Sequence, residues 1–133
     1  MRPPRSHPPR HPVILVVEDS PALLELMQEI LEAAEFLVLP AANATQALEL
    51  AGCCASPIHL LITKLHPGEM SGPDLAGLLR RQCPEMSVLY TSANPLAALE
   101  IPDPQEVVSC MLPRPFSKER LLRRVHTLLA AHV

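Results

Sequence analysis

Residues 13–21 read Val-Ile-Leu-Val-Val-Glu-Asp-Ser-Pro, and this stretch decides the fold class. Its first five residues are aliphatic and mostly β-branched, which is typical of a strand that is buried on both faces of a parallel sheet. Ser20 is a favourable helix N-cap, and Pro21 is a favourable first helical residue. A buried strand followed at once by a helix indicates the first half of a β-α-β unit.

Apolar residues after Pro21 recur every three or four positions, as on the buried side of a helix. They are Leu23, Leu26, Met27, Ile30, Leu31 and Ala34. The alternation of strand and helix then continues to the end of the chain. Further strands are predicted at 36–39, 58–62, 86–90 and 107–112. One further helix is predicted through Ala47, Leu48 and Leu50, a second from Pro73 through Leu75, Leu78 and Leu79, and a third over 95–100. The last helix is predicted to begin near Ser117 and to bury Leu121, Leu122, Val125, Leu128 and Leu129.

Five strands that alternate with helices predict an α/β protein with a doubly wound, five-stranded parallel sheet. In such sheets functional groups gather beyond the carboxyl ends of the strands, near the switch in strand order. The residues at these ends are Glu18 with Asp19, Thr63 with Lys64, Thr91 with Ser92, and Pro113 with Arg114.

The 133 residues are enough for one domain, and 48% of them are hydrophobic. Five prolines and the lack of apolar periodicity predict a flexible arm or linker over 1–12, so that 13–133 form the domain. Arg2, Arg5 and Arg10 lie in that arm; without them, 8 of the 11 basic residues remain against 14 acidic residues, a net charge of −6. Such an acidic body is a poor nucleic-acid binder, because phosphate contacts require clustered Lys and Arg.

Cys53, Cys54, Cys83 and Cys110 lack the paired spacing of a zinc site and lie in or beside apolar segments. They are therefore predicted to be buried free thiols in a reducing compartment. No apolar run approaches the roughly 18 residues of a membrane span, and the N-terminus lacks the apolar stretch of a signal peptide. These features predict a cytoplasmic protein without a membrane partner.

Glu18 and Asp19 form an acidic pair directly after the first strand. Two adjacent carboxylates repel each other unless a cation lies between them, and such pairs commonly bind Mg²⁺, which prefers oxygen ligands. The alternative is a pair of acids at a helix start, where the helix macrodipole favours negative charge. The pair alone does not distinguish these two interpretations.

Five segments along the chain form an ordered set of motifs. They are Val-Val-Glu-Asp-Ser at 16–20, His-Leu-Leu-Ile-Thr at 59–63, Met-Ser-Gly-Pro-Asp-Leu at 70–75, Val-Leu-Tyr-Thr-Ser-Ala at 88–93 and Leu-Pro-Arg-Pro-Phe-Ser at 112–117. Their order and spacing over 13–131 resemble the receiver domain of two-component response regulators. Each motif is weak alone, but the set is specific.

The resemblance implies a flavodoxin-like fold that takes a phosphoryl group from a histidine kinase onto an aspartate, with Mg²⁺ as cofactor. It places Glu18 and Asp19 at the metal-binding pair and Ser92 at the hydroxyl that contacts the phosphoryl group. Arg114 lies where the family has a phosphoryl-binding lysine. Pro115 follows it as in the family, where this peptide bond is often cis.

The phosphoacceptor position in this resemblance is occupied by Lys64, eight residues before Gly72. The usual proline of the loop is one place early, at Pro67, and the nearest carboxylate after the strand, Glu69, lies too far along the loop. An acyl phosphate requires a carboxylate nucleophile, whereas an ammonium group has no free lone pair at neutral pH. Lys64 also adds a positive charge where Mg²⁺ would bind, so neither phosphorylation nor a bound metal is expected.

Met111 lies three residues before Arg114, where many receivers have a Tyr or Phe that acts as a switch. Methionine packs well but cannot act as an aromatic switch. The leading hypothesis is a non-enzymatic pseudo-receiver of two-component or phosphorelay signalling that acts through protein-protein interaction. The alternatives are a phosphorelay receiver with an unorthodox acceptor such as Ser92 or Thr63, an enzyme with Lys64 as a Schiff-base nucleophile, and the C-terminal receiver fragment of a hybrid histidine kinase.

A protein partner is expected, and a histidine kinase or another signalling protein is a candidate. Basic residues dominate the chain from 114 to the last helix. They are Arg114, Lys118, Arg120, Arg123 and Arg124, against Glu119. A surface of this charge fits an acidic partner face. The alternative is an ordinary solvated helix face whose cations complement the helix C-terminus.

Overall fold

The computed structural model describes residues 11–54, 56–65, 70–92 and 111–130. Within these residues five strands form one parallel sheet in the order β2-β1-β3-β4-β5. The strands are β1 (Val13–Val17), β2 (Leu37–Ala41), β3 (Leu60–Lys64), β4 (Ser87–Ser92) and β5 (Met111–Pro113). This order confirms the predicted doubly wound sheet of the flavodoxin-like type.

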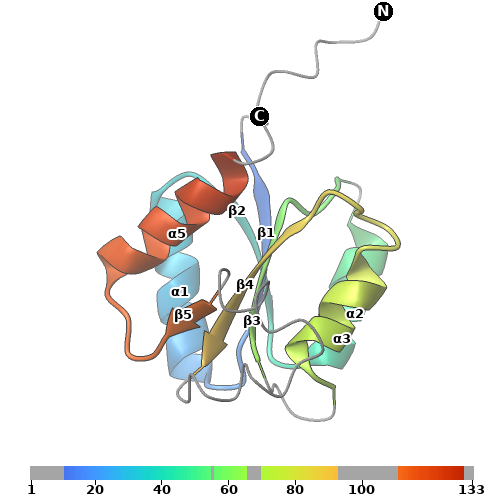
Figure 1. Ribbon diagram of the computed structural model, residues 1–133, viewed down its shortest axis with the longest axis horizontal. Helices are drawn as coiled ribbons and strands as arrows, with labels where there is room; N and C mark the ends of the chain where they lie inside the picture. Colours follow the sequence, from blue (N-terminus) through green and yellow to red (C-terminus); the bar gives the residue numbers. More distant parts are fainter. Residues whose placement is uncertain (1–10, 55, 66–69, 93–110, 131–133) are drawn as a thin grey trace, which may run out of the picture.

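Helices cover both faces of the sheet (Figure 1). They are α1 (Pro21–Ala33), α2 (Ala44–Cys53), α3 (Gly72–Leu79) and α5 (Lys118–Ala130). α1 and α5 lie on one face, whereas α2 and α3 lie on the other. None of these described helices is long and apolar enough to cross a membrane.

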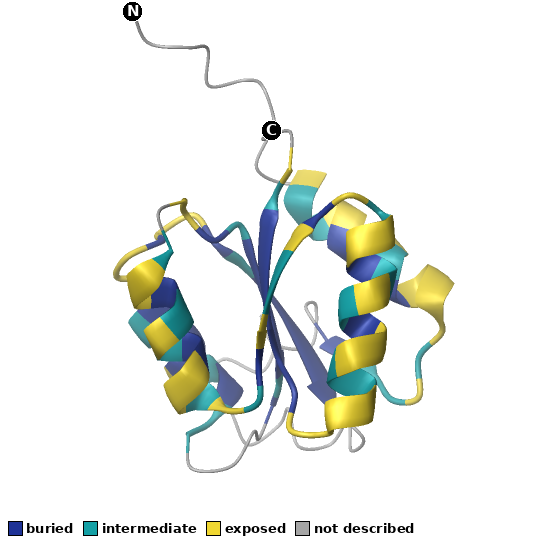
Figure 2. Ribbon diagram, turned by 180° about the vertical axis from the view of Figure 1, so that it is seen from behind, coloured by how far each residue is buried: buried dark blue, intermediate teal, exposed yellow. Residues whose placement is uncertain are grey.

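Successive residues of β1 point to opposite faces and divide the hydrophobic core in two. The odd-numbered residues of β1 pack with buried residues of α2 and α3, and the even-numbered ones pack with α1 and α5. Every residue of β1 is buried, as the dark blue central strand in Figure 2 shows. The run at 13–17 is therefore the strand buried on both faces that the sequence predicted.

The strands reach further toward their carboxyl ends than the apolar runs predict. β2, β3 and β4 end at Ala41, Lys64 and Ser92 instead of at 39, 62 and 90. The added residues are mostly small or polar, but they stay in register with a neighbouring strand, as Lys64 does with Thr91. Backbone hydrogen bonding, which apolar patterning does not report, sets these strand ends.

The region before β5 is predicted to hold a helix at 95–100 and the start of a strand at 107–112. Residues 95–100 and 107–110 lie outside the described part of the chain. The described part of that strand is β5, which continues one residue beyond the prediction to Pro113.

Serine side chains act as N-caps for three of the described helices. Ser20, Ser71 and Ser117 precede α1, α3 and α5, and each accepts a hydrogen bond from the backbone N–H three residues further on. The predicted starts at Ser20 and near Ser117 are confirmed. α3 begins at Gly72 instead of at Pro73, because Ser71 supplies the cap.

The predicted burial of two helix faces is correct only in part. In α1 the buried residues are Met27 and Leu31, and Leu26 is 50% exposed, so its predicted place in the core is wrong. In α5, Leu121 and Val125 are buried, and the other three predicted leucines are only partly buried. A row of apolar residues wider than the contact with the sheet leaves its outer members in solvent.

The cysteines within the described residues are free thiols, but their burial differs from the prediction. Cys83 is buried, and its Sγ accepts a hydrogen bond from the backbone N–H of Ile58 at 3.3 Å. Cys53 is exposed and Cys54 is half-buried, because alanines form the buried side of α2. The prediction of burial is therefore wrong for Cys53, and Cys110 lies outside the described residues.

His11 and Pro12, at the end of the predicted arm, already contact the domain. The carbonyl of Pro12 accepts a hydrogen bond from the backbone N–H of Leu37 at 3.0 Å. Nδ1 of His11 lies 3.1 Å from the carbonyl oxygen of Glu35. Within the described residues, contact with the sheet thus begins before Val13.

Candidate functional site

The carboxyl ends of four neighbouring strands bring the predicted site residues to one edge of the sheet. Glu18 and Asp19 follow β1, Lys64 ends β3, Ser92 ends β4 and Arg114 follows β5. These strands are adjacent in the order β1-β3-β4-β5, and parallel pairing aligns their ends. Residues far apart in the sequence therefore share one small region.

Glu18 is the buried acid of this edge, and its side chain is 1% exposed. Its Oε2 accepts a hydrogen bond from the backbone N–H of Ser20 at 2.9 Å. Its Oε1 forms an ion pair with Nη2 of Arg114, whose side chain is 18% exposed. A buried carboxylate is costly unless it has both hydrogen bonds and an opposite charge. Arg114 is therefore the counter-ion of Glu18.

Further contacts hold Arg114 in place. Its Nη2 donates a hydrogen bond to Oγ1 of Thr91 at 3.1 Å, and its backbone N–H donates to the carbonyl of Ser92 at 2.9 Å. The peptide bond to Pro115 is cis, as predicted. Sequence reasoning placed Thr91 at the strand end but gave it no role. The signal that could have identified Thr91 is a hydroxyl residue at the carboxyl end of one predicted strand when an arginine follows the neighbouring strand.

Lys64 and Asp19 form a second ion pair, nearer to solvent than the first. Nζ of Lys64 donates a hydrogen bond to Oδ1 of Asp19 at 2.8 Å. The Lys64 side chain is 28% exposed and that of Asp19 is 61% exposed. The hydrogen bond from the Lys64 ammonium lowers the pKa of Asp19. Each of the two acids thus has its own cationic partner.

The Mg²⁺ that the resemblance implies does not fit this arrangement. Both oxygens of Glu18 already accept from Ser20 and Arg114, and Oδ1 of Asp19 accepts from Lys64. Across the described residues, no group of three or more His, Cys, Asp and Glu side chains could hold a metal ion. A divalent cation would have to displace a guanidinium and an ammonium group to reach these oxygens. The donor set favours two cationic side chains instead of a metal.

The remaining predicted residues are buried. Thr63 is fully buried, and its hydroxyl donates a hydrogen bond to the carbonyl of Lys64 at 3.1 Å. Ser92 is buried at the end of β4. Met111 is buried in the core beside α2 and α3, in register with Tyr90. None of these three side chains lies open to solvent.

The sequence matches the protein family described as Response regulator receiver domain over residues 14–126. It is also similar to the sensor histidine kinase TmoS of Ectopseudomonas mendocina, with 32% identity over 124 residues. That alignment covers 92% of this chain but 12% of the kinase. The chain thus spans a small part of the length of this relative.

Solved structures show the same architecture. The signal receiver domain of an HD domain-containing protein from Pseudomonas fluorescens Pf-5 has a TM-score of 0.79 and 26% identity, covering 92% of this chain and 98% of the other. A CheY-like response regulator receiver domain protein from Methanospirillum hungatei JF-1 also has a TM-score of 0.79, at 20% identity, covering 92% of this chain and 96% of the other. The second likeness concerns the fold alone.

Proposed function

This chain belongs to the family of response regulator receiver domains, and from that membership we propose that it is a non-enzymatic receiver module that cannot accept a phosphoryl group and acts through contact with another protein. The observation that carries the proposal is Lys64, which ends β3 with its Nζ 2.8 Å from Oδ1 of Asp19. By the resemblance of the motifs, this is the position of the acceptor aspartate.

Phosphorylation of an aspartate has two requirements, and a chain with Lys64 at the acceptor position meets neither. The acceptor must be a carboxylate nucleophile, and Lys64 supplies a hydrogen-bond donor in its place. The developing negative charge must also be stabilised, commonly by a metal ion. Here the acids that would bind the ion are paired with Lys64 and Arg114. We infer that the pocket is neutral without metal and offers no nucleophile.

The contacts of Arg114 support a module with a single conformation. Its guanidinium is shared between Glu18 and Thr91, and its backbone is bonded to the end of β4. Met111 is buried in the core, where its flexible thioether fills space but offers no aromatic ring to act as a switch. We propose that a partner recognises the module itself and not its state of phosphorylation.

Particular observations bear on two of the alternatives: the receiver with an unorthodox acceptor and the segment of a hybrid histidine kinase. A receiver with an unorthodox acceptor is disfavoured at Thr63, because its hydroxyl is fully buried and bonded to a carbonyl. Ser92 is then the acceptor to test. A receiver segment of a hybrid histidine kinase is favoured by the 32% identity to a sensor histidine kinase. Such a segment would also lack the acceptor carboxylate, because Lys64 occupies that position in either case.

We propose a partner surface with fewer basic residues than the sequence suggested. Arg114 is paired with the buried Glu18, so its charge does not contribute to an exposed surface. Lys118, Arg120 and Arg123 are exposed on α5. These three cations still favour an acidic partner face.

Transfer from a labelled, autophosphorylated histidine kinase tests the proposal. We expect no label on the wild-type chain, on Ser92→Ala or on Thr63→Val, while an unrelated receiver with an aspartate acceptor takes the label in the same reaction. Label that reaches the wild type and is lost in Ser92→Ala would establish the unorthodox acceptor instead.

A further inference from the structure

His59 lies at the opposite end of the sheet from the ion pairs described above. It directly precedes β3, at the amino-terminal ends of the strands, and Figure 1 shows this end beside the last turns of α5. Its backbone N–H donates to the carbonyl of Val13 at 2.9 Å, and its carbonyl accepts from the N–H of Ser87 at 3.0 Å. His59 therefore joins the start of β3 to the starts of β1 and β4.

The imidazole of His59 makes a further contact with β1. Its Nδ1 accepts a hydrogen bond from the backbone N–H of Val13 at 3.0 Å. Val13 is the first residue of β1 and is only 3% exposed, so its N–H needs a partner within the protein. Nδ1 accepts through its lone pair, so the proton of the neutral ring lies on Nε2. The contact therefore requires an unprotonated Nδ1.

Two other histidines lie at this end of the sheet, but their contacts do not require an unprotonated nitrogen. Nδ1 of His11 faces the carbonyl oxygen of Glu35, which can only accept, so this nitrogen carries a proton. The ring of His126 contacts that of Phe36, with centroids 5.5 Å apart, and a charged ring can keep such a contact. Among the histidines that the structure describes, His59 is thus the one whose ring loses a hydrogen bond on protonation.

The elements that meet at this end of the sheet also carry carboxylates, a guanidinium and a thiol. They are Glu35 before β2, Glu85 before β4, Arg80, whose Nε donates to the carbonyl of Met86, and Cys83, whose Sγ accepts from the N–H of Ile58. The side chain that ordinarily changes its charge between about pH 8 and pH 5 is that of histidine. We therefore expect the response of this end to mild acid to come from its histidines.

We propose that His59 is a pH-sensitive switch that controls the pairing of the starts of β1 and β3. The neutral ring holds the N–H of Val13, whereas proton uptake turns Nδ1 into a donor and removes this hydrogen bond. The opened state binds the proton without that loss, so mild acid favours opening. Opening also loosens residues 11–12, which contact the start of β2 through Pro12. The switch is remote from Lys64, so it does not depend on the loss of phosphorylation.

Native-state hydrogen exchange of the full chain, followed by NMR, tests the proposal. The protection factor of the Val13 amide, corrected for the intrinsic exchange rate at each pH, should fall about tenfold from about pH 7.5 to about pH 5.5, as expected for the loss of one hydrogen bond. The amide of Leu15, further along β1, should change less. The nitrogen chemical shifts of the His59 ring should report the Nε2–H tautomer at the higher pH and a doubly protonated ring at the lower pH.

His59→Asn is the matched variant, because its Oδ1 can accept from Val13 in place of Nδ1 but does not titrate. It should keep the protection of Val13 at both pH values, whereas His59→Phe should lose it at both. His11→Gln and His126→Gln control for the other two histidines and should show the same fall as the wild type.

Thermal unfolding of each variant confirms that it folds, and if His59→Phe does not fold, the comparison of wild type with His59→Asn decides. Three results would each overturn the proposal. They are a Val13 amide of the wild type that is equally protected at both pH values, an Nδ1–H tautomer of His59 at about pH 7.5, and an undiminished fall in His59→Asn.

Discussion

Replacing Arg114 by methionine should destabilise the fold far more than replacing Lys64 by methionine. Both changes remove one positive charge from the same edge of the sheet and keep a flexible apolar side chain. They differ in the acid that is left behind. Arg114→Met leaves Glu18, which is 1% exposed, whereas Lys64→Met leaves Asp19, which is 61% exposed.

The burial of each acid sets the expected magnitude. Removing one partner of a buried ion pair costs about 3–5 kcal/mol, because the remaining charge cannot be hydrated. Removing one partner of a pair near the surface costs about 0–1 kcal/mol, because water and salt replace the lost interaction. The free energies of unfolding of the two variants should therefore differ by roughly 2–5 kcal/mol.

Urea denaturation at neutral pH measures both losses. Arg114→Lys is the charge-preserving control and should lose less stability than Arg114→Met, although it cannot reproduce both contacts of the guanidinium. The double variant Glu18→Gln with Arg114→Met should recover part of the loss, because it removes the uncompensated charge. Equal losses for Lys64→Met and Arg114→Met, or no recovery in the double variant, would refute the reasoning.

Three further predictions follow from other contacts. The hydrogen bond from Lys64 lowers the pKa of Asp19 below its ordinary value of 3.8, so the pair should stabilise the fold above pH 3.8 and stop doing so as the pH falls through the folded-state pKa. The difference in the free energy of unfolding between wild type and Lys64→Met, measured by urea denaturation, should therefore shrink over that range of pH. Gly72→Ala should lower the free energy of unfolding by about 1–3 kcal/mol, because the added Cβ would lie 2.7 Å from the carbonyl oxygen of Lys64. Gly77→Ala is the matched control: its Cβ meets no atom within 4 Å, so thermal unfolding should show it to be neutral or stabilising by up to about 1 kcal/mol. Reversing Arg120 and Arg123 to Glu should weaken a complex with an acidic protein partner and reduce its salt dependence; an unchanged affinity would place that interface elsewhere.

The fold could be predicted because each β-strand has a local signature. The run at 13–17 indicates a strand buried on both faces, and Ser20 with Pro21 indicates the helix that follows it. The strand ends could not be placed, because Lys64 belongs to β3 through backbone pairing with β4 and not through its side chain. Patterns of apolar residues report burial, whereas pairing depends on a strand that lies elsewhere in the sequence.

The site could be predicted as a group of residues but not as a set of contacts. The ends of the predicted strands brought Glu18, Asp19, Lys64 and Arg114 to one edge, and the structure places them there. Which cation pairs with which acid depends on how deeply each side chain is buried. Arg114, after β5, pairs with the buried Glu18, and Lys64 pairs with the exposed Asp19. The sequence does not encode that depth locally.

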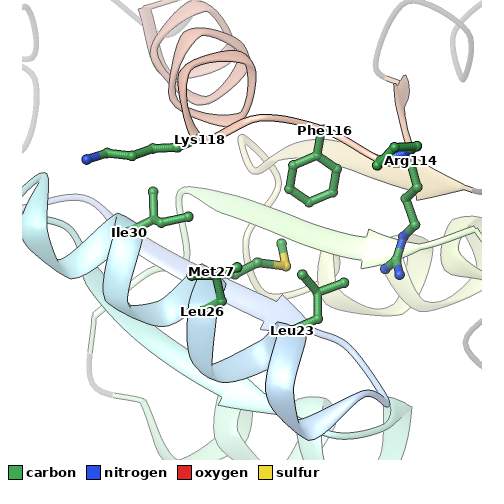
Figure 3. A pocket seen from close by; sticks show the side chains of 8 residues that line it. Leu23, Leu26, Met27, Ile30, Arg114, Phe116 and Lys118 are labelled. Carbon is green, nitrogen blue, oxygen red and sulfur yellow. The ribbon is translucent and has the colours of Figure 1, made fainter.

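The exposure of Leu26 on α1 is a feature that the sequence did not predict. Leu23, Leu26 and Ile30 have the spacing of core residues, and the helical pattern alone assigns them to the core. In the structure Leu23 and Ile30 pack partly against the core, whereas Leu26 is 50% exposed (Figure 3). Amphipathic spacing identifies an apolar row but not the surface that covers it.

Intact-mass spectrometry of the wild-type chain after incubation with acetyl phosphate and Mg²⁺ tests the central claim most directly. A receiver with an aspartate acceptor, treated in the same way, shows that the reagents are active, and Lys64→Asp tests whether this position alone limits the reaction. The account predicts that the mass of the wild type stays unchanged, because Lys64 offers an ammonium group paired with Asp19 where a carboxylate is required. A stable gain of one phosphoryl group on the wild-type chain would contradict it.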